Sequence, residues 1–196
     1  VGAVLNRAKV QNGETVVVIG AGGVGLSVVM AAKLKGASQV ICIDQNISAR
    51  NLAIELGATD FLVSKQNEDI SEKLMELTGV GADHVFEAVG KRELQSDAID
   101  CCCSGGTVTF VGLDSEDATI NLKTTAITRA EKTISGSIYG SACTHRDFAL
   151  YGEKFLEGKL PIDLMVNRRY HLREINIALS DMLEGKPGRG VIVFDH

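Results

Sequence analysis

The stretch TVVVIGAGGVG at residues 15–25 decides the fold of this chain. An apolar run of the kind that forms a buried strand breaks into glycines with the spacing G-x-G-x-x-G. Gly20 lets the chain turn sharply, Gly22 has no side chain to hold a phosphate away from the backbone, and Gly25 lets the next helix approach the sheet. The stretch therefore predicts a strand, a tight turn and a helix that bind a diphosphate.

Two further features separate this stretch from a glycine turn with a purely structural role. The predicted helix begins near Gly23, where N–H groups without an internal partner and the helix dipole attract negative oxygens. A second apolar run at residues 40–43 ends on Asp44, about 20 residues beyond the last glycine of the motif. Together they favour a dinucleotide-binding unit.

The composition narrows the class of protein. The chain has 196 residues, 45% of them hydrophobic and 23% charged, which is typical of one globular domain with an appendage. No run approaches the ~18 to 20 apolar residues of a membrane span, and we expect a cytoplasmic protein without a signal peptide. A formal net charge of −5 without a basic cluster argues against nucleic acid or membrane partners. Because the chain starts at Val1 with a predicted helix, we expect a piece of a longer protein.

The cysteines and histidines indicate neither a metal site nor a catalytic centre. The five cysteines, Cys42, Cys101, Cys102, Cys103 and Cys143, form no C-x-x-C pair, which favours reduced thiols in an intracellular protein. The three consecutive cysteines are expected on a helix, where they point about 100° apart and cannot close a tetrahedral site by themselves. We therefore favour packing over metal binding for them, and the four histidines lack ligand spacing.

Strands and helices alternate along the first two thirds of the chain. The expected strands lie at 15–19, 39–43, 61–63, 83–87, 107–111 and 132–139, and helices near 23–34, 48–56, 70–77 and 93–103 separate the first five of them. Strands that are apolar throughout, with helices between them, imply a parallel sheet covered on both faces. The predicted fold class is α/β, a doubly wound Rossmann sheet of six strands in the order 3-2-1-4-5-6.

The regular alternation of strands and helices ends after Tyr139. Two helices near 146–157 and 172–183 and two extended segments at 165–170 and 190–194 are too few to bury a core of their own. We therefore expect a dinucleotide-binding domain at residues 1–140. Residues 141–196 are expected to be the C-terminal segment of a catalytic lobe whose remainder is absent from this chain.

Six phrases of the sequence carry a family resemblance: GAGGVG at 20–25, DQN at 44–46, ELGAT at 55–59, FEAVG at 86–90, GG at 105–106 with VG at 111–112, and GRGVI at 188–192. The whole chain resembles the zinc-containing alcohol dehydrogenases of the medium-chain dehydrogenase/reductase superfamily. The pair YG at 139–140 and the tract GKLP at 158–161 further resemble the aryl-alcohol and formaldehyde dehydrogenase branches.

The resemblance implies hydride transfer between NAD and a primary alcohol or aldehyde, aromatic ones included. The family's zinc ligands and proton relay precede the point where this chain starts, so zinc is expected only in the absent lobe. The chain itself would bind NAD(H) without catalysis. We expect a homodimer through the edge strand at 132–139, because exposed sheet edges pair with their own copies and members of the family dimerise in this way.

The resemblance also implies a role for each cofactor-binding residue. Asp44 would accept hydrogen bonds from the adenosine ribose and favour NAD over NADP by about 10- to 100-fold. Where the family often has a lysine that holds the ribose, this chain has Ala49, and Arg50 either replaces that lysine or is a surface cation. Arg189 would reach the diphosphate, unless it is an exposed loop charge.

The loop residues Val111, Gly112 and Leu113 match family positions beside the nicotinamide, and Ile138 and Tyr139 match positions beside its carboxamide. The expected cofactor-binding residues are Gly20, Gly22, Gly23, Val24, Gly25, Asp44, Gln45, Arg50, Ala88, Val89, Val111, Gly112, Leu113, Ile138, Tyr139 and Arg189. No catalytic and no metal-binding residue is expected in the chain.

Two other readings of the glycine motif stay open. A stand-alone NAD(H)-binding regulatory module would need the segment after Tyr139 to form its own core. An S-adenosylmethionine methyltransferase has a similar turn and acid, but the full G-x-G-x-x-G spacing and the other family phrases disfavour it.

Overall fold

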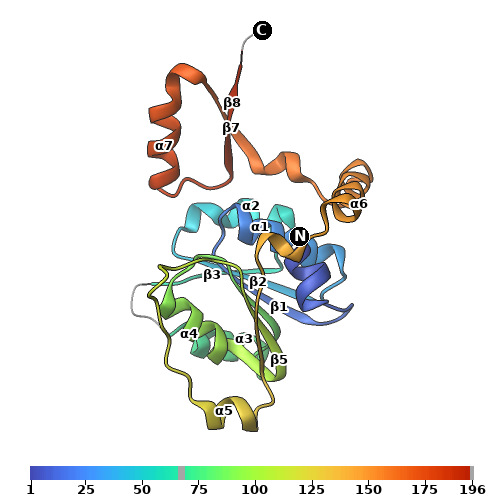
Figure 1. Cartoon of the computed structure of the whole chain (residues 1–196), viewed down its shortest axis with the longest axis vertical. Helices are drawn as coiled ribbons and strands as arrows, with labels where there is room; N and C mark the ends of the chain where they lie inside the picture. The colour runs from blue at the N-terminus through green and yellow to red at the C-terminus, as the bar shows by residue number, and fades with distance from the viewer. Residues whose placement is uncertain (66–68, 195–196) are drawn as a thin grey trace.

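The structure of the protein is a computed structural model that describes residues 1–65 and 69–194. Its centre is a six-stranded sheet (Figure 1) made of β1 Thr15–Ile19, β2 Gln39–Asp44, β3 Asp60–Val63, β4 Ala82–Glu87, β5 Cys102–Phe110 and β6 Thr133–Gly136. All neighbouring strands are parallel, and their order is β3-β2-β1-β4-β5-β6. The predicted fold class and strand order are confirmed. The order reverses between β1 and β4, where ligands bind in sheets of this kind.

Helices cover both faces of the sheet. One buried cluster joins Val16 and Val18 of β1 to α1 Gly23–Leu34 and α2 Arg50–Leu56. Another joins Val17 and Ile19 of the same strand to the helices α3 Ile70–Thr78 and α4 Arg92–Cys101. Because successive side chains point to opposite faces and both faces are covered, the strand is apolar throughout.

The chain after β6 forms a separate group of elements: η3 Tyr139–Ser141, α6 Thr144–Leu156, η4 Ile162–Met165, β7 Val166–His171, η5 Leu172–Glu174, α7 Ile175–Leu183 and β8 Arg189–Val193. The strands β7 and β8 form a parallel pair of their own, which stands with α7 beyond α1 and α2 in Figure 1. No residue of α7 is buried within the described part of the chain. Leu160 and Met165, in contrast, belong to the first buried cluster and anchor this group to the sheet domain.

The prediction of one helix through Cys103 is wrong. The helix α4 ends at Cys101, and Cys102 already belongs to β5, so the three consecutive cysteines do not share a helix. The register between β4 and β5 shifts after Ala82, which accommodates the early start of the strand. Burial raises the pKa of Cys42, Cys101 and Cys102 to about 12, so these side chains stay as unreactive thiols near neutral pH.

Three shorter segments also differ from expectation. The sixth strand covers only Thr133–Gly136, because its partner β5 ends at Phe110 and offers no further backbone to pair with. The helix α5 Thr124–Arg129, which was not expected, precedes that strand. A helix is present at the start of the chain as expected, but it is the π-helix η1 Ala3–Ala8.

Candidate dinucleotide-binding site

The turn between β1 and α1 combines close packing with an open side. Gly20 has a φ of +105°, in the left-handed region that favours glycine, and its N–H donates to the Ile43 carbonyl at 2.8 Å. A Cβ on Gly25 would collide with the Gly20 carbonyl oxygen. A Cβ on Gly22 would meet no atom of the described residues within 4 Å. A ligand can therefore approach the backbone at Gly22, while Gly25 is needed for packing.

The first turn of α1 offers unpaired donors. Gly22 is its N-cap residue, and no side chain of the described residues caps this end of the helix. The N–H groups of Gly23, Val24 and Gly25 therefore lack an intrahelical acceptor. Such groups, together with the helix dipole, suit a phosphate.

Asp44 connects the end of β2 to this turn. Its Oδ2 accepts a hydrogen bond from the Ala21 N–H at 2.6 Å, and its Oδ1 accepts one from the Asn46 N–H at 2.8 Å. A carboxylate has about four acceptor positions on its two oxygens, so both oxygens can still accept a hydroxyl. The backbone contacts orient the carboxylate beside the glycine turn.

A cavity of about 820 Å³ lies between the glycine turn and the C-terminal elements. From the sheet domain it is lined by the backbone around Gly22 and Gly23 and by Asp44 and Gln45 at the end of β2. The opposite wall comes from β7, one face of α7 and residues 184–190. The site is thus assembled from segments more than a hundred residues apart.

Arg189 brings a positive charge to the glycine turn. A Cβ on Gly23 would collide with the Arg189 guanidinium, which therefore lies directly against the start of α1. Asn46 Nδ2 donates to the Gly185 carbonyl at 3.0 Å and joins the loop after β2 to the segment before Arg189, and both residues line the cavity. A planar cation here suits a diphosphate held at the helix N-terminus.

The other predicted residues lie outside this cavity, as far as the described residues show. Arg50, at the start of α2, is exposed, and its neighbour Ala49 lines the cavity instead. The pairs and triplets expected near the nicotinamide follow β4, β5 and β6: they are Ala88 and Val89, then Val111, Gly112 and Leu113, then Ile138 and Tyr139. All of them lie at the carboxyl ends of parallel strands, the same edge of the sheet as the glycine turn.

Glu87 holds the loops after β4 and β5 together, a role that sequence reasoning missed. Its side chain is fully buried, and Oε1 accepts N–H groups of Val89 and Gly90, both at 2.8 Å. Its carbonyl accepts the N–H groups of Val111 at 2.8 Å and Gly112 at 3.0 Å. Burial raises the pKa of this carboxyl. The sequence signal that could have indicated this role was an acidic residue at the end of an otherwise apolar strand.

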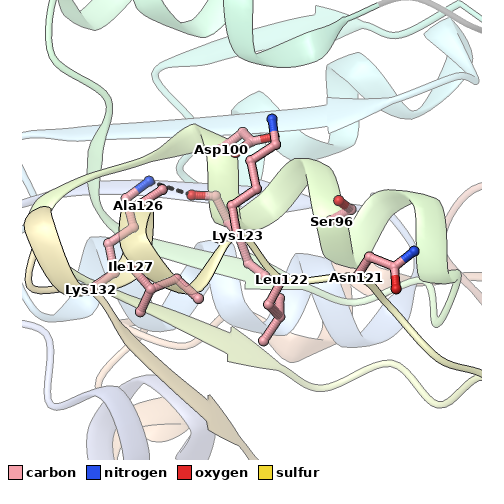
Figure 2. A pocket seen from close by; sticks show the side chains of 9 residues that line it. Ser96, Asp100, Asn121, Leu122, Lys123, Ala126, Ile127 and Lys132 are labelled. Atoms are coloured by element: carbon pink, nitrogen blue, oxygen red, sulfur yellow. Dashed lines mark hydrogen bonds between the residues drawn. The ribbon is translucent and has the colours of Figure 1, made fainter.

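A second, smaller cavity does not have the character of this site. It lies between α4 and α5, and Figure 2 shows its polar groups, among them the Lys132 ammonium that donates to the Ile99 carbonyl at 2.6 Å. The helices α4 and α5 lead into β5 and β6, so this cavity is at the amino ends of the strands. Ligands of open α/β sheets bind at the carboxyl ends.

The chain is similar to known dehydrogenases over most of its length. A sequence model of the zinc-binding dehydrogenase family matches residues 23–156. An NDMA-dependent alcohol dehydrogenase of Amycolatopsis methanolica is 36% identical over 94% of this chain and 50% of its own length. An S-(hydroxymethyl)glutathione dehydrogenase of Saccharomyces cerevisiae is 33% identical over 99% of this chain and 51% of its own length. The benzyl alcohol dehydrogenase of Acinetobacter calcoaceticus superimposes with a TM-score of 0.94 at 31% identity, over 99% of this chain and 53% of that one.

The chain belongs to the zinc-binding dehydrogenase family. It is an α/β protein of the medium-chain dehydrogenase type, and it spans about half the length of the curated relatives it matches. Within the described residues no group of three or more His, Cys, Asp or Glu side chains could hold a metal ion. None of the described helices is long and apolar enough to cross a membrane.

Proposed function

We propose that this chain is the cofactor-binding half of an NAD-dependent, zinc-dependent alcohol dehydrogenase, with residues 1–140 as the NAD-binding domain and residues 141–196 as part of the catalytic lobe. One observation carries the proposal: the uncapped start of α1, the Asp44 carboxylate and the Arg189 guanidinium surround one cavity. A cation and free N–H groups suit a diphosphate, and a carboxylate suits ribose hydroxyls. A primary alcohol, aromatic alcohols included, is the proposed substrate, because a structural neighbour is named a benzyl alcohol dehydrogenase.

Different residues of this chain would bind different parts of the cofactor. The N–H groups of the first turn of α1 and the Arg189 guanidinium would hold the diphosphate, and Asp44 would orient the adenosine ribose. The loops that Glu87 ties together would support the nicotinamide. When bound, NAD supplies the hydride acceptor of the reaction.

Titration of the purified chain tests this proposal. We expect NAD to bind at least about 10-fold more tightly than NADP in calorimetry, because a 2′-phosphate would meet the Asp44 carboxylate. Asp44→Asn should weaken the binding of NAD and reduce the preference for NAD over NADP. Asp117→Asn, at an exposed loop position, should change neither. Equal or tighter binding of NADP, or no saturation at millimolar NAD, would contradict the proposal.

The chain by itself should oxidise no alcohol, because the proposed zinc ligands and proton relay lie outside it. Turnover by the purified chain would contradict this part of the proposal. The exposed apolar residues of α7 that do not line the cavity, such as Ile177 and Leu183, fit a surface covered by the rest of a catalytic lobe. They disfavour the alternative of a stand-alone regulatory module, which would need a core in this region.

A homodimer completes the proposal. Among the described strands β6 pairs only with β5, so the other edge of Thr133–Gly136 is free to pair with a second copy. Sedimentation should show a species of twice the chain mass, and a monomer at all concentrations would speak against the dimer.

A further inference from the structure

The turn that leads into Arg189 is held by two neighbouring side chains of β7. Asn167 Nδ2 donates to the Pro187 carbonyl at 2.8 Å, and Arg168 Nη2 donates to the Lys186 carbonyl at 3.0 Å. These carbonyls belong to residues 184–188, which connect α7 to β8. The position at which β8 begins, and with it Arg189, therefore depends on contacts made by β7.

A bulge in β7 accounts for the direction of the Asn167 side chain. Val166 pairs with Arg189 and Arg168 pairs with Gly190, so two steps along β7 correspond to one step along β8. Asn167 is the extra residue and has no partner in the strand pairing. A bulge re-aims the side chain of the extra residue, and here the amide reaches the turn.

The contact between the Asn167 amide and the turn is close. Gly188 has a φ of +83°, and a Cβ at this position would collide with the Asn167 side-chain amide. The amide therefore supports the turn by packing as well as by its hydrogen bond. The turn is tied to the sheet domain from its other end, where Asn46 donates to the Gly185 carbonyl.

We propose that Asn167 is a positioning residue for Arg189, which places the guanidinium against the start of α1 so that both can hold one diphosphate. This inference rests on the proposed function, because it requires that Arg189 binds the diphosphate of NAD. Charge-assisted hydrogen bonds depend steeply on distance and angle. Without the Asn167 contact, the turn would occupy further conformations, and only a fraction of molecules would present Arg189 correctly.

A double-mutant cycle on the purified chain tests the inference, with NAD affinity measured by calorimetry. Asn167→Leu keeps the size of the side chain but has no donor, and Asn167→Ala removes the group. Each should raise the Kd for NAD by about 3- to 10-fold, the size of one net hydrogen bond. In the Arg189→Ala background the same substitutions should change the Kd by less than about 2-fold, because no guanidinium remains to be positioned.

Two further measurements complete the test. Asn176→Ala, on the exposed surface of α7, should leave the Kd unchanged. The salt dependence of NAD binding should become shallower in Asn167→Leu, toward that of Arg189→Ala, because an ionic contact is lost. An equal loss of affinity in both backgrounds, or no loss at all, would contradict the positioning role of Asn167. The proposed function would not be affected by either result. Absence of NAD binding by the unaltered chain would overturn the proposed function and this inference with it.

Discussion

Gly22 and Gly25 lie three residues apart and meet different needs of the same turn. A Cβ on Gly25 would collide with the Gly20 carbonyl oxygen, whereas a Cβ on Gly22 would enter open space at the cavity. Glycine at position 25 is therefore a requirement of the fold. Glycine at position 22 is a requirement of the ligand that we propose for this cavity.

Alanine substitutions should separate the two needs. Gly22→Ala should reduce the free energy of unfolding by less than about 1 kcal/mol, as at other N-cap positions. The same substitution should weaken the binding of NAD at least about 10-fold, because the methyl group would occupy the position of the diphosphate. Gly25→Ala should lower the free energy of unfolding by about 1–3 kcal/mol through overpacking. Urea denaturation and calorimetry on the same preparations check both. Unchanged NAD affinity in Gly22→Ala would contradict the proposed place of the diphosphate.

The loops after β4 and β5 behave as one element because they share a buried centre. The Glu87 carboxylate accepts hydrogen bonds from the loop after its own strand, and the Glu87 carbonyl accepts them from the loop after β5. A Cβ on Gly112 would collide with the backbone of Gly90, so the two loops also touch. The residues expected at the nicotinamide are therefore positioned jointly.

The pH dependence of stability should report on this buried centre. Burial raises the pKa of Glu87 above its ordinary value of 4.5, so the folded protein holds this proton more tightly than the unfolded chain does. The contribution of Glu87 to stability is then largest below pH 4.5 and is lost as the pH rises through the raised pKa.

Glu87→Gln tests this sign by urea denaturation from pH 4 upward. The stability of the unaltered chain relative to the variant should fall as the pH rises. Glu116→Gln, at an exposed position after β5, controls for the loss of one negative charge. A relative stability that increases with pH would contradict the assignment.

At the scale of the whole molecule, Asp147 joins the first and the last parts of the chain. The side chain is 2% exposed and accepts hydrogen bonds from Asn6 Nδ2 and the Cys143 N–H, both at 2.8 Å, and from Arg146 Nε at 2.5 Å. Asn6 lies in η1 and Asp147 lies in α6, which follows the sheet domain. The carboxylate thus fastens the C-terminal elements to the start of the chain.

Acid should loosen this connection. The Arg146 guanidinium lowers the pKa of Asp147 from 3.8 to about 2, so its stabilising effect is present above pH 3.8 and is lost as the pH falls through about 2. Asp147→Asn should therefore be less stable than the unaltered chain near neutral pH and approach its stability near pH 2. Thermal unfolding followed by circular dichroism checks this. Asp163→Asn, at an exposed position in η4, is the matched control, and a difference that persists at low pH would contradict the assignment.

Periodicity in the sequence predicted the sheet well and its boundaries less well. Residues 15–19 and 39–43 were recognisable because strands covered on both faces are apolar throughout. The end of α4 was not recognisable, because Cys101, Cys102 and Cys103 have no helix-breaking residue among them and the pairing with β4 decides where the strand starts. The sixth strand was predicted too long, because its length depends on where β5 ends.

The sequence by itself determined the α/β class and the glycine turn with its acid, because these follow from local patterns of side-chain size, polarity and spacing. The family followed from its resemblance to known dehydrogenases, and the strand order from the fold type that the alternation of strands and helices indicates. Only the tertiary structure decided that the Arg189 guanidinium lies against Gly23, that Asn167 supports the turn before Arg189, and that Glu87 joins two loops. The physical reason is distance along the chain. These contacts arise from a bulge in β7, from the reach of the Arg189 side chain across to the start of α1, and from the parallel alignment of β4 with β5, none of which leaves a local pattern in the sequence.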